Sequence, residues 1–202
     1  MKKFALTVLI IALAGSVFFS NQSVSKQKKS KPNAALIKRG KYLVTIAGCN
    51  DCHSPKVFTK MGPMPDETRL LSGHPANDKL PPVPPGVVAA SPDKWGALGS
   101  GDFTGWVGPW GTSYTANLTP DQETGLGTWT EGMFIGALRK GKHMGVGRDI
   151  LPPMPWPMYG QMTTDDLKAV FAYLQSLPPI SNAVPDPLSP TGEPIATPRH
   201  LE

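Results

Sequence analysis

Three stretches of the chain repeat apolar residues at the three- and four-residue spacing that is typical of an amphipathic helix. The first covers residues 34–48, the second residues 129–140, and the third runs from 164 to about 177. The pattern predicts three helices. Their expected inward-facing residues are Ala35, Leu36, Tyr42, Leu43, Ile46 and Ala47 in the first, Met133, Phe134, Ala137 and Leu138 in the second, and Leu167, Val170, Phe171 and Leu174 in the third.

Polar residues and helix breakers at the ends of these stretches define the expected boundaries. Thr130 can cap the second helix, and Gly141 can end it. Thr163 or Thr164 can cap the third helix, which Pro178-Pro179 would stop. We therefore expect the helices to begin and end close to these residues.

Between the first and second helices, residues 56–116 show neither helical nor strand periodicity. Prolines and glycines recur along this segment, and proline is excluded from helix interiors and central strands. The segment is nevertheless too rich in aromatic residues for pure disorder. We predict an ordered but irregular insertion inside an otherwise helical domain of residues 34–180. Its aromatic residues include Trp95, Phe103, Trp106, Trp110 and Tyr114.

The two ends of the chain differ in composition from this domain. A basic start at Met1-Lys2-Lys3 precedes a mostly apolar run to Phe19, which is typical of an export signal. Residues 1–25 are expected to be a removed signal or a retained anchor, because small residues offer more than one cleavage position. Residues 26–33 form a basic linker and residues 181–202 a proline-rich tail. We expect an exported protein, either periplasmic or anchored on the outer side of the cytoplasmic membrane.

The net charge of +5, from 20 basic and 15 acidic residues, comes from the N-terminal end of the chain. Six lysines lie before residue 33, and without them the remainder is close to neutral. Basic patches interleaved with aromatic residues are absent, so the sequence gives no support to nucleic-acid binding. The lysine run could contact an anionic membrane surface or be a solvated linker.

Candidate chemistry lies directly after the first helix, in Cys49-Asn50-Asp51-Cys52-His53. Cys-x-x-Cys-His is the attachment sequence of a c-type haem. The two thiols can add across the two vinyl groups of haem, and the histidine can ligate the iron. Covalent attachment agrees with an export signal, because c-type haem is usually joined outside the cytoplasm. We predict one covalent haem c, held by Cys49 and Cys52 with His53 on the iron.

Three other uses of this segment stay open. Cys49 and Cys52, the two cysteines of the chain, could be a redox dithiol, although no βαβ pattern typical of thioredoxin is visible. They could be half of a zinc site, which needs four ligands, and only His74, His143 and His200 remain besides His53. They could also form a small-loop disulfide.

A methionine between prolines is the candidate for the second axial ligand of the iron. Residues 151–157 read Leu-Pro-Pro-Met-Pro-Trp-Pro, and each proline locks φ near −65° and extends the residue before it. Met154 is thus held on a stiff strap, which suits a thioether that must stay on an iron atom. Met154 could instead fill a gap in the core. Met144, Met158 and Met162 compete for the ligand role.

Two further side chains are candidates for contact with haem. Arg139 stands near the end of the second helix, where the helix dipole favours cations, and could pair with a haem propionate. His74 lies in the insertion and could be a sixth iron ligand, a surface residue or a structural histidine.

A helix, Cys-x-x-Cys-His, a methionine strap and a final helix occur here in the order of a class I cytochrome c. The resemblance covers residues 34–180 and implies an all-α fold, with helices around a covalent haem and residues 56–116 as an irregular insertion. In that fold the first and last helices cross where a small residue faces an aromatic one. Gly40 and Tyr173 match those positions.

Downstream segments resemble the cytochrome c subunits of membrane-bound bacterial alcohol and gluconate dehydrogenases. In that family the methionine of the Pro-Met-Pro segment is the distal iron ligand, which corresponds to Met154. Those subunits carry three haem domains, whereas this chain has one attachment motif and resembles one of their domains. The matching segments are Asn117-Leu118-Thr119-Pro120-Asp121, Thr124-Gly125-Leu126-Gly127-Thr128-Trp129, Ala137-Leu138-Arg139-Lys140-Gly141, Pro153-Met154-Pro155-Trp156 and Met162-Thr163-Thr164-Asp165-Asp166-Leu167.

These features predict a single-haem electron carrier rather than an enzyme, in an exported respiratory or dehydrogenase-linked chain. Its expected partners are a dehydrogenase as donor and an oxidase or another cytochrome as acceptor. Ligands on both sides of the iron favour electron transfer over ligand chemistry. The alternatives are a haem enzyme subunit, either peroxidase-like with His74 or His143 as acid or base or a dehydrogenase electron acceptor, and a redox or gas sensor. The insertion could select the partner or cover the haem.

Overall fold

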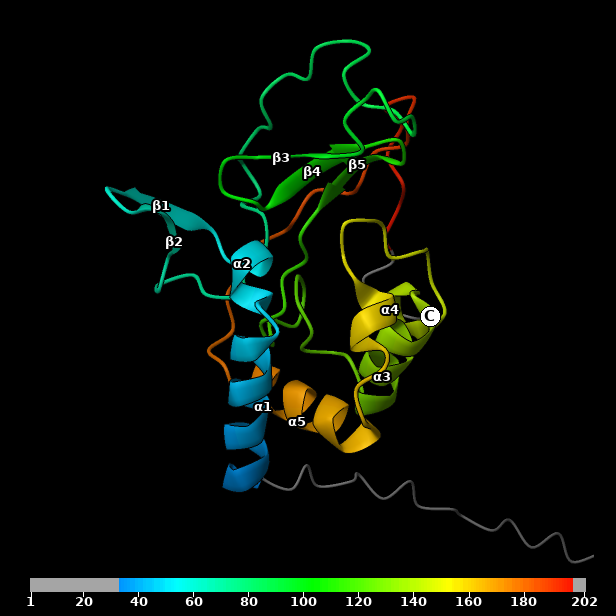
Figure 1. Ribbon diagram of the computed structural model, residues 1–202. Helices are drawn as coiled ribbons and strands as arrows, with labels where there is room; N and C mark the ends of the chain where they lie inside the picture. Colours follow the sequence, from blue (N-terminus) through cyan, green and yellow to red (C-terminus); the bar gives the residue numbers. More distant parts are fainter. Residues whose placement is uncertain (1–32, 198–202) are drawn as a thin grey trace, which may run out of the picture. The chain divides into compact units, whose positions relative to one another are not determined.

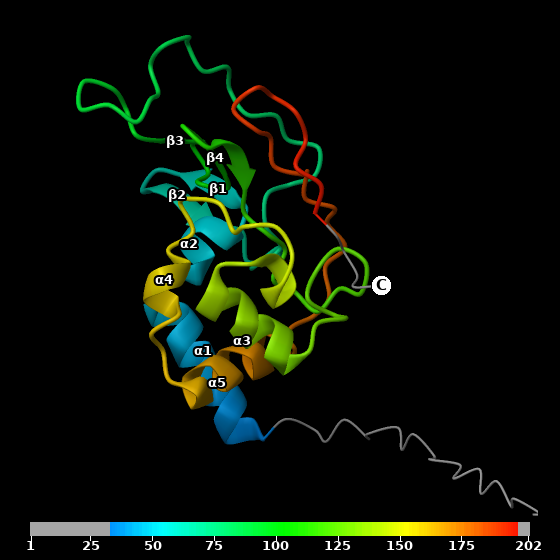
Figure 2. The same ribbon diagram turned by 90° about the vertical axis from the view of Figure 1, so that its right-hand side faces the viewer.

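The structure, a computed structural model, describes residues 33–197. Within this range, two helices come first, short strands and long irregular segments follow, and the remaining helices come after the strands (Figure 1). The two views show the longer helices gathered at one end and a small sheet with irregular connections at the other (Figures 1 and 2). The helices are α1 (Ala34–Ile46), α2 (Cys49–His53), α3 (Glu131–Lys140), α4 (Trp156–Tyr159) and α5 (Thr164–Leu174), with a 3-10 turn at His143–Gly145.

The three predicted helices are confirmed as α1, α3 and α5, but Tyr42 and Ile46 of α1, which were expected to face inward, are exposed. The Thr130 hydroxyl accepts a hydrogen bond from the Met133 N–H and caps α3, and Gly141 ends this helix at a φ of 64°. Thr163 caps α5 by accepting from the Asp166 N–H. The boundaries that the sequence predicted therefore follow from side chains that satisfy the free backbone groups at each helix end.

The main hydrophobic core lies between α1, α3 and α5. Phe134 of α3 packs against Phe171 of α5 with ring centroids 5.3 Å apart. All four residues of the predicted α5 stripe are buried. The burial of these apolar side chains supplies most of the stabilisation of a short helical unit of this kind. The core comprises Leu43, Val44, Leu71, Leu126, Phe134, Ala169, Val170, Phe171 and Leu174.

Helices α1 and α5 cross, as Figures 1 and 2 show from two sides, and Gly40 lies at their contact. A Cβ atom at Gly40 would collide with the backbone carbonyl of Ala169 and lie 2.7 Å from the Cβ of Tyr173. The predicted pairing of Gly40 with Tyr173 is therefore confirmed. Glycine is required here because the two helix backbones approach too closely for any side chain.

The prediction of an all-α fold is wrong, because the insertion forms two small antiparallel sheets. Strands β1 (Lys56–Thr59) and β2 (Gly62–Pro65) make a two-stranded ribbon. Strands β3 (Leu98–Gly99), β4 (Gly105–Gly108) and β5 (Gly111–Tyr114) pair in the order β3-β4-β5. The described chain is thus a mixed helical and strand structure.

Prolines of the insertion stand where a sheet tolerates them. Pro63 and Pro65 lie in β2, a ribbon strand with a free edge that does not need every N–H. Pro109 and Trp110 form the two-residue connection between β4 and β5, which Gly111 closes at a φ of 101°. Strands this short carry too few residues to show a two-residue alternation, which is why the sequence pattern did not reveal them.

The proline-rich tail packs along the insertion over its described part. Leu188 exchanges both backbone hydrogen bonds with Thr112 of β5, each 2.9 Å long. The Asn182 side chain donates to the carbonyls of Ser72 and His74. This segment therefore closes over the insertion.

Two predictions concern residues outside the described range. They are the export signal or anchor at residues 1–25 and, apart from Asn33, the basic linker at residues 26–33. Across residues 33–197, every helix is too short or too polar to reach from one face of a membrane to the other.

Replacing Gly40 with alanine tests the helix crossing. Alanine normally stabilises a helix interior by about 1 kcal/mol relative to glycine. At Gly40 the collision with the Ala169 backbone should reverse this sign and destabilise the protein by about 1–3 kcal/mol. Denaturant unfolding of the purified protein measures the change.

Gly132→Ala in α3 is the matched control, because the nearest neighbour of its added Cβ is 3.8 Å away. It should leave stability unchanged or raise it slightly. If the two variants unfold at the same denaturant concentration, Gly40 is not the point of closest approach.

Candidate functional site

The Cys-x-x-Cys-His segment forms a single helical turn directly after α1. Gly48 precedes it with a φ of 66°, a left-handed conformation that redirects the chain from α1 into α2. On a helix, residues three and four positions apart share one face. Cys49, Cys52 and His53 therefore project from the same side of α2.

The His53 ring is oriented by a carbonyl from a distant part of the chain. Its Nδ1 lies 2.8 Å from the oxygen of Ala116, and a carbonyl can only accept, so Nδ1 carries the proton. The lone pair is then on Nε2. Burial lowers the pKa of His53, which keeps the imidazole neutral. A neutral histidine whose other nitrogen donates to a carbonyl has the form of a metal ligand.

No disulfide joins Cys49 and Cys52, and burial raises the pKa of each thiol, that of Cys49 to about 11. The thiols of a thioredoxin-type redox pair have lowered pKa values instead. Within residues 33–197, no three His, Cys, Asp or Glu side chains gather as a metal site. The redox-dithiol and zinc hypotheses therefore gain no support.

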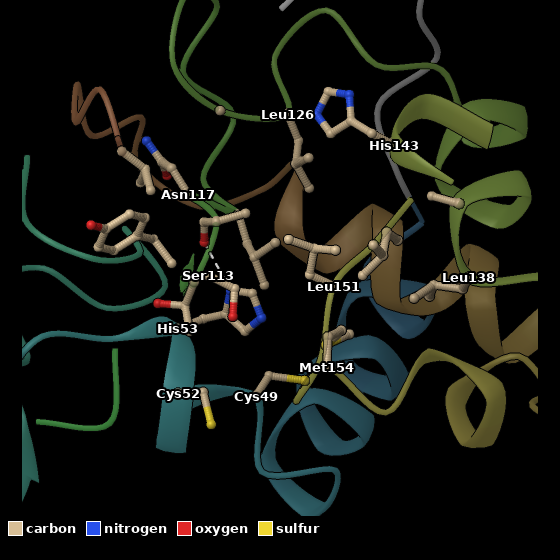
Figure 3. A pocket seen from close by; sticks show the side chains of 18 of the residues that line it. Cys49, Cys52, His53, Ser113, Asn117, Leu126, Leu138, His143, Leu151 and Met154 are labelled. Carbon is tan, nitrogen blue, oxygen red and sulfur yellow. Dashed lines mark hydrogen bonds between the residues drawn. The ribbon is translucent and has the colours of Figure 1, made fainter. Parts of the chain in front are cut away.

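Cys49, Cys52, His53 and Met154 all line one cavity of about 290 Å³. Figure 3 shows these four side chains together, from α2 and from the strap before α4. Most of the wall is apolar, as a buried planar cofactor needs. Apolar lining residues include Leu43, Leu118, Leu126, Phe134, Leu138, Leu151, Pro153, Val170 and Leu174.

The methionines that compete with Met154 differ in position. Met162 also lines the cavity. Met144 is buried but does not line it, and Met158 is 72% exposed. Met154 and Met162 are thus the methionines that the described structure brings to the cavity.

The two other predicted candidates lie away from the cavity wall. Arg139 does not line the cavity, and its guanidinium donates to the carbonyl of Gly160. The His74 ring is buried, with Nδ1 2.7 Å from the Thr104 hydroxyl and Nε2 3.3 Å from the Asp78 carbonyl. His74 therefore has the contacts of a structural histidine.

Two polar side chains from the turn after α3, His143 and Arg148, line the cavity. The His143 N–H donates to the Arg148 carbonyl at 2.8 Å. Burial and the neighbouring Arg148 lower the pKa of His143 to about 4. His143 was considered from the sequence as a distal acid or base, whereas Arg148 carries no motif and only its place at the cavity reveals it.

Buried polar atoms without partners also gather at this cavity. Within residues 33–197, the buried side-chain atoms that lack a hydrogen bond are Thr115 Oγ1 and His143 Nδ1. Both residues line the cavity. Such atoms cost free energy unless something supplies a partner. The cavity is therefore built for a mainly apolar occupant with a few polar groups.

The wall that carries Ala116 is fixed by the next residue, Asn117. Its buried side chain accepts from the N–H and hydroxyl of Thr119, and donates to the Thr124 hydroxyl and the Ile180 carbonyl. Asn117 thereby joins the wall to the segment after α5. The carbonyl that orients His53 sits beside this anchor.

Comparison with known proteins gives relatives but no matching family model. The chain is 30% identical to the gluconate 2-dehydrogenase cytochrome c subunit of Pantoea cypripedii over 78% of its length. It is 28% identical to the alcohol dehydrogenase (quinone) cytochrome c subunit of Gluconobacter oxydans over 86% of its length. It is also 35% identical to the fructose dehydrogenase cytochrome subunit of Gluconobacter japonicus, over 34% of its length.

The chain resembles the cytochrome c subunits of bacterial dehydrogenases. It spans 28% of the gluconate 2-dehydrogenase subunit and 29% of the alcohol dehydrogenase subunit. These shares fit the expectation that it corresponds to one domain of a longer cytochrome subunit. The resemblance predicted from the sequence segments is thus confirmed, and haem is the cofactor that a cytochrome c implies.

The cavity residues fit a c-type haem. Two thiols and a neutral histidine project from one face of α2, and the histidine lone pair is not used by the protein. A methionine thioether also lines the cavity, and most of the wall is apolar. Within residues 33–197, two buried polar atoms at the cavity have no hydrogen-bond partner. When bound, haem supplies one-electron chemistry at its iron.

Asn117→Leu tests whether this side chain anchors the His53 wall. The variant keeps a similar volume but leaves the Thr119 N–H without its partner, whereas the Ile180 carbonyl keeps a hydrogen bond from the Thr119 hydroxyl. Stranding a buried polar group costs about 1–3 kcal/mol, so unfolding should become easier by about 1–3 kcal/mol. Asn77→Leu, at an exposed position, is the control and should change stability little. Equal stability of both variants would show that the anchor lies elsewhere.

Proposed function

We propose that the chain is a mono-haem c-type cytochrome that carries single electrons in an exported, dehydrogenase-linked or respiratory chain. One observation carries the proposal: Cys49, Cys52, His53 and Met154 line a single apolar cavity. The cytochrome subunit names of the relatives support a haem protein with an electron-transfer role. They also favour an electron carrier over a catalytic subunit.

Each residue has a separate role in this proposal. Cys49 and Cys52 hold the haem by thioether bonds, and His53 ligates the iron through Nε2, as its Nδ1 hydrogen bond to Ala116 allows. Met154 is the second axial ligand. A thioether opposite a histidine raises the potential and leaves no open coordination site, which suits electron transfer.

The alternatives of a peroxidase-like enzyme or a gas sensor need an open or displaceable iron site. His74 does not line the cavity, and both of its ring nitrogens face protein partners, so it is poorly placed as a distal acid or base. His143 does line the cavity. In Figure 3, however, it lies across the cavity from the two cysteines rather than beside His53 or Met154.

The proposed location and partners rest on the sequence and on the relatives. A basic start and an apolar run favour export to the periplasm or to the outer side of the cytoplasmic membrane. The relatives are subunits of gluconate, alcohol and fructose dehydrogenases. A dehydrogenase is therefore the proposed donor, and an oxidase or another cytochrome the acceptor.

Covalent attachment predicts that haem stays with the denatured protein. After acid-acetone extraction the polypeptide should remain coloured, and its mass should exceed that of the processed chain by one haem. Cys49→Ser and Cys52→Ser should each remove one thioether bond, and the double variant should release the haem. Extractable haem in the unaltered protein, or a mass gain of two haems, would contradict the proposal.

Met154 ligation predicts a spectroscopic change that no other methionine variant causes. The ferric protein should be low-spin, with the weak near-infrared absorption of sulfur-ligated iron. Met154→Ala should abolish this band and lower the midpoint potential, because a thioether favours ferrous iron.

Two controls separate ligation from packing. Met162→Ala alters another methionine at the same cavity, and Met158→Ala alters an exposed one, so both should keep the band. If the band survives in Met154→Ala and disappears in Met162→Ala, then Met162 is the ligand.

A further inference from the structure

The wall of the cavity that faces away from the cysteines carries a positive and a hydrogen-bonding group. Figure 3 shows His143 across the cavity from Cys49 and Cys52, with Leu126 and Leu151 in the space between. Arg148 lines the same cavity and is joined to His143 by a backbone hydrogen bond of 2.8 Å. The Arg148 charge also acts on the His143 ring, so the two side chains lie near each other.

Within residues 33–197, His143 Nδ1 has no hydrogen-bond partner, and the Arg148 guanidinium has hydrogen bonds but no ion pair. His143 Nδ1 is buried without a hydrogen bond, while its ring packs edge-on against Trp129 with centroids 5.0 Å apart. The Arg148 Nε donates to the Thr197 hydroxyl at 2.6 Å, and one terminal nitrogen donates to the Asp149 carbonyl at 2.9 Å. Within residues 33–197, no carboxylate lies at ion-pairing distance from Arg148. A half-buried guanidinium is costly without an opposite charge, so this position favours the binding of an anion.

The orientation of a haem tethered at α2 indicates what this anion is. The vinyl groups of haem and its propionate groups lie on opposite edges of the macrocycle. Thioether bonds to Cys49 and Cys52 would fix the vinyl edge at α2. The propionate edge would then face the wall that carries His143 and Arg148.

We propose that Arg148 and His143 bind a haem propionate, Arg148 through its guanidinium and His143 through Nδ1–H. This inference rests on the proposed haem site and assigns the propionate contact that Arg139 was expected to make. Arg148 supplies a charge-assisted hydrogen bond, and the planar guanidinium matches a carboxylate. The lowered pKa of His143 keeps its ring neutral, so one ring nitrogen can donate without a second charge.

Burial lowers the pKa of Arg148, and an acidic residue of the cavity opposes this effect. Asp186 lines the cavity and favours the charged form of Arg148, although it lies beyond ion-pairing distance. Asp149 pairs instead with Lys142. Arg148 thus stays charged and keeps donor capacity for the propionate.

The midpoint potential of the purified holoprotein tests the assignment. Arg148→Gln should lower the equilibrium constant for reduction about tenfold, or about 59 mV for one electron, because an uncompensated propionate stabilises ferric iron. Arg139→Gln is the matched control, since Arg139 donates to a backbone carbonyl and does not line the cavity. It should leave the potential unchanged.

Resonance Raman spectra of the haem propionate bending mode provide a readout that a merely structural arginine would not change. Arg148→Gln and His143→Phe should each shift this mode, and Phe keeps the ring that packs against Trp129. Arg148→Lys retains the charge but not the planar fork, so it should restore most of the potential while the mode stays shifted. If Arg148→Gln does not accumulate with haem, Arg148→Lys and His143→Phe decide the matter.

The outcomes separate this inference from the proposed function. An unaltered protein without covalent haem would overturn the proposed function itself. A haem-loaded protein whose potential and propionate mode do not respond to changes at Arg148 and His143 would overturn only the propionate assignment. The same would follow if Arg139→Gln caused the shifts instead.

Discussion

The hydrogen bond from His53 Nδ1 to the Ala116 carbonyl is the contact on which the site depends. It joins α2 to a wall that lies 63 residues further along the chain, and it leaves Nε2 with the lone pair that can ligate a metal. Asn117 holds this wall through four hydrogen bonds. The Gly40 crossing holds α1, which leads into α2, against α5. Both anchors therefore help to position one imidazole at the cavity.

Much of the helical part could be predicted because its signals are local. Apolar spacing identified α1, α3 and α5, and the caps at Thr130 and Thr163 follow from backbone groups that a helix leaves free. We also expected α2 and the Met154 strap to meet at one cavity, because Cys-x-x-Cys-His is a haem-attachment motif and the flanking prolines stiffen the segment that carries Met154. Whether these residues hold haem stays a prediction.

The rest could not be predicted, because it depends on contacts between distant segments. The short strands of the insertion pair through backbone hydrogen bonds and leave no alternating pattern. Arg139 seemed a good partner for a propionate because it ends a helix, but its guanidinium turns to Gly160. Arg148 has no sequence signal, His143 was considered only as a distal acid or base, and the folded chain brings both to the cavity. The sequence could therefore identify the attachment edge of the site but not its opposite wall.

The central claim is that one iron atom lies between His53 and Met154 in this cavity. Anomalous diffraction at the iron absorption edge, from crystals of the purified holoprotein, tests it most directly. We expect a single anomalous peak per chain, within bonding distance of His53 Nε2 and the Met154 sulfur, with density joining Cys49 and Cys52 to the macrocycle. A peak beside a different side chain, or a second iron in the same chain, would contradict the account.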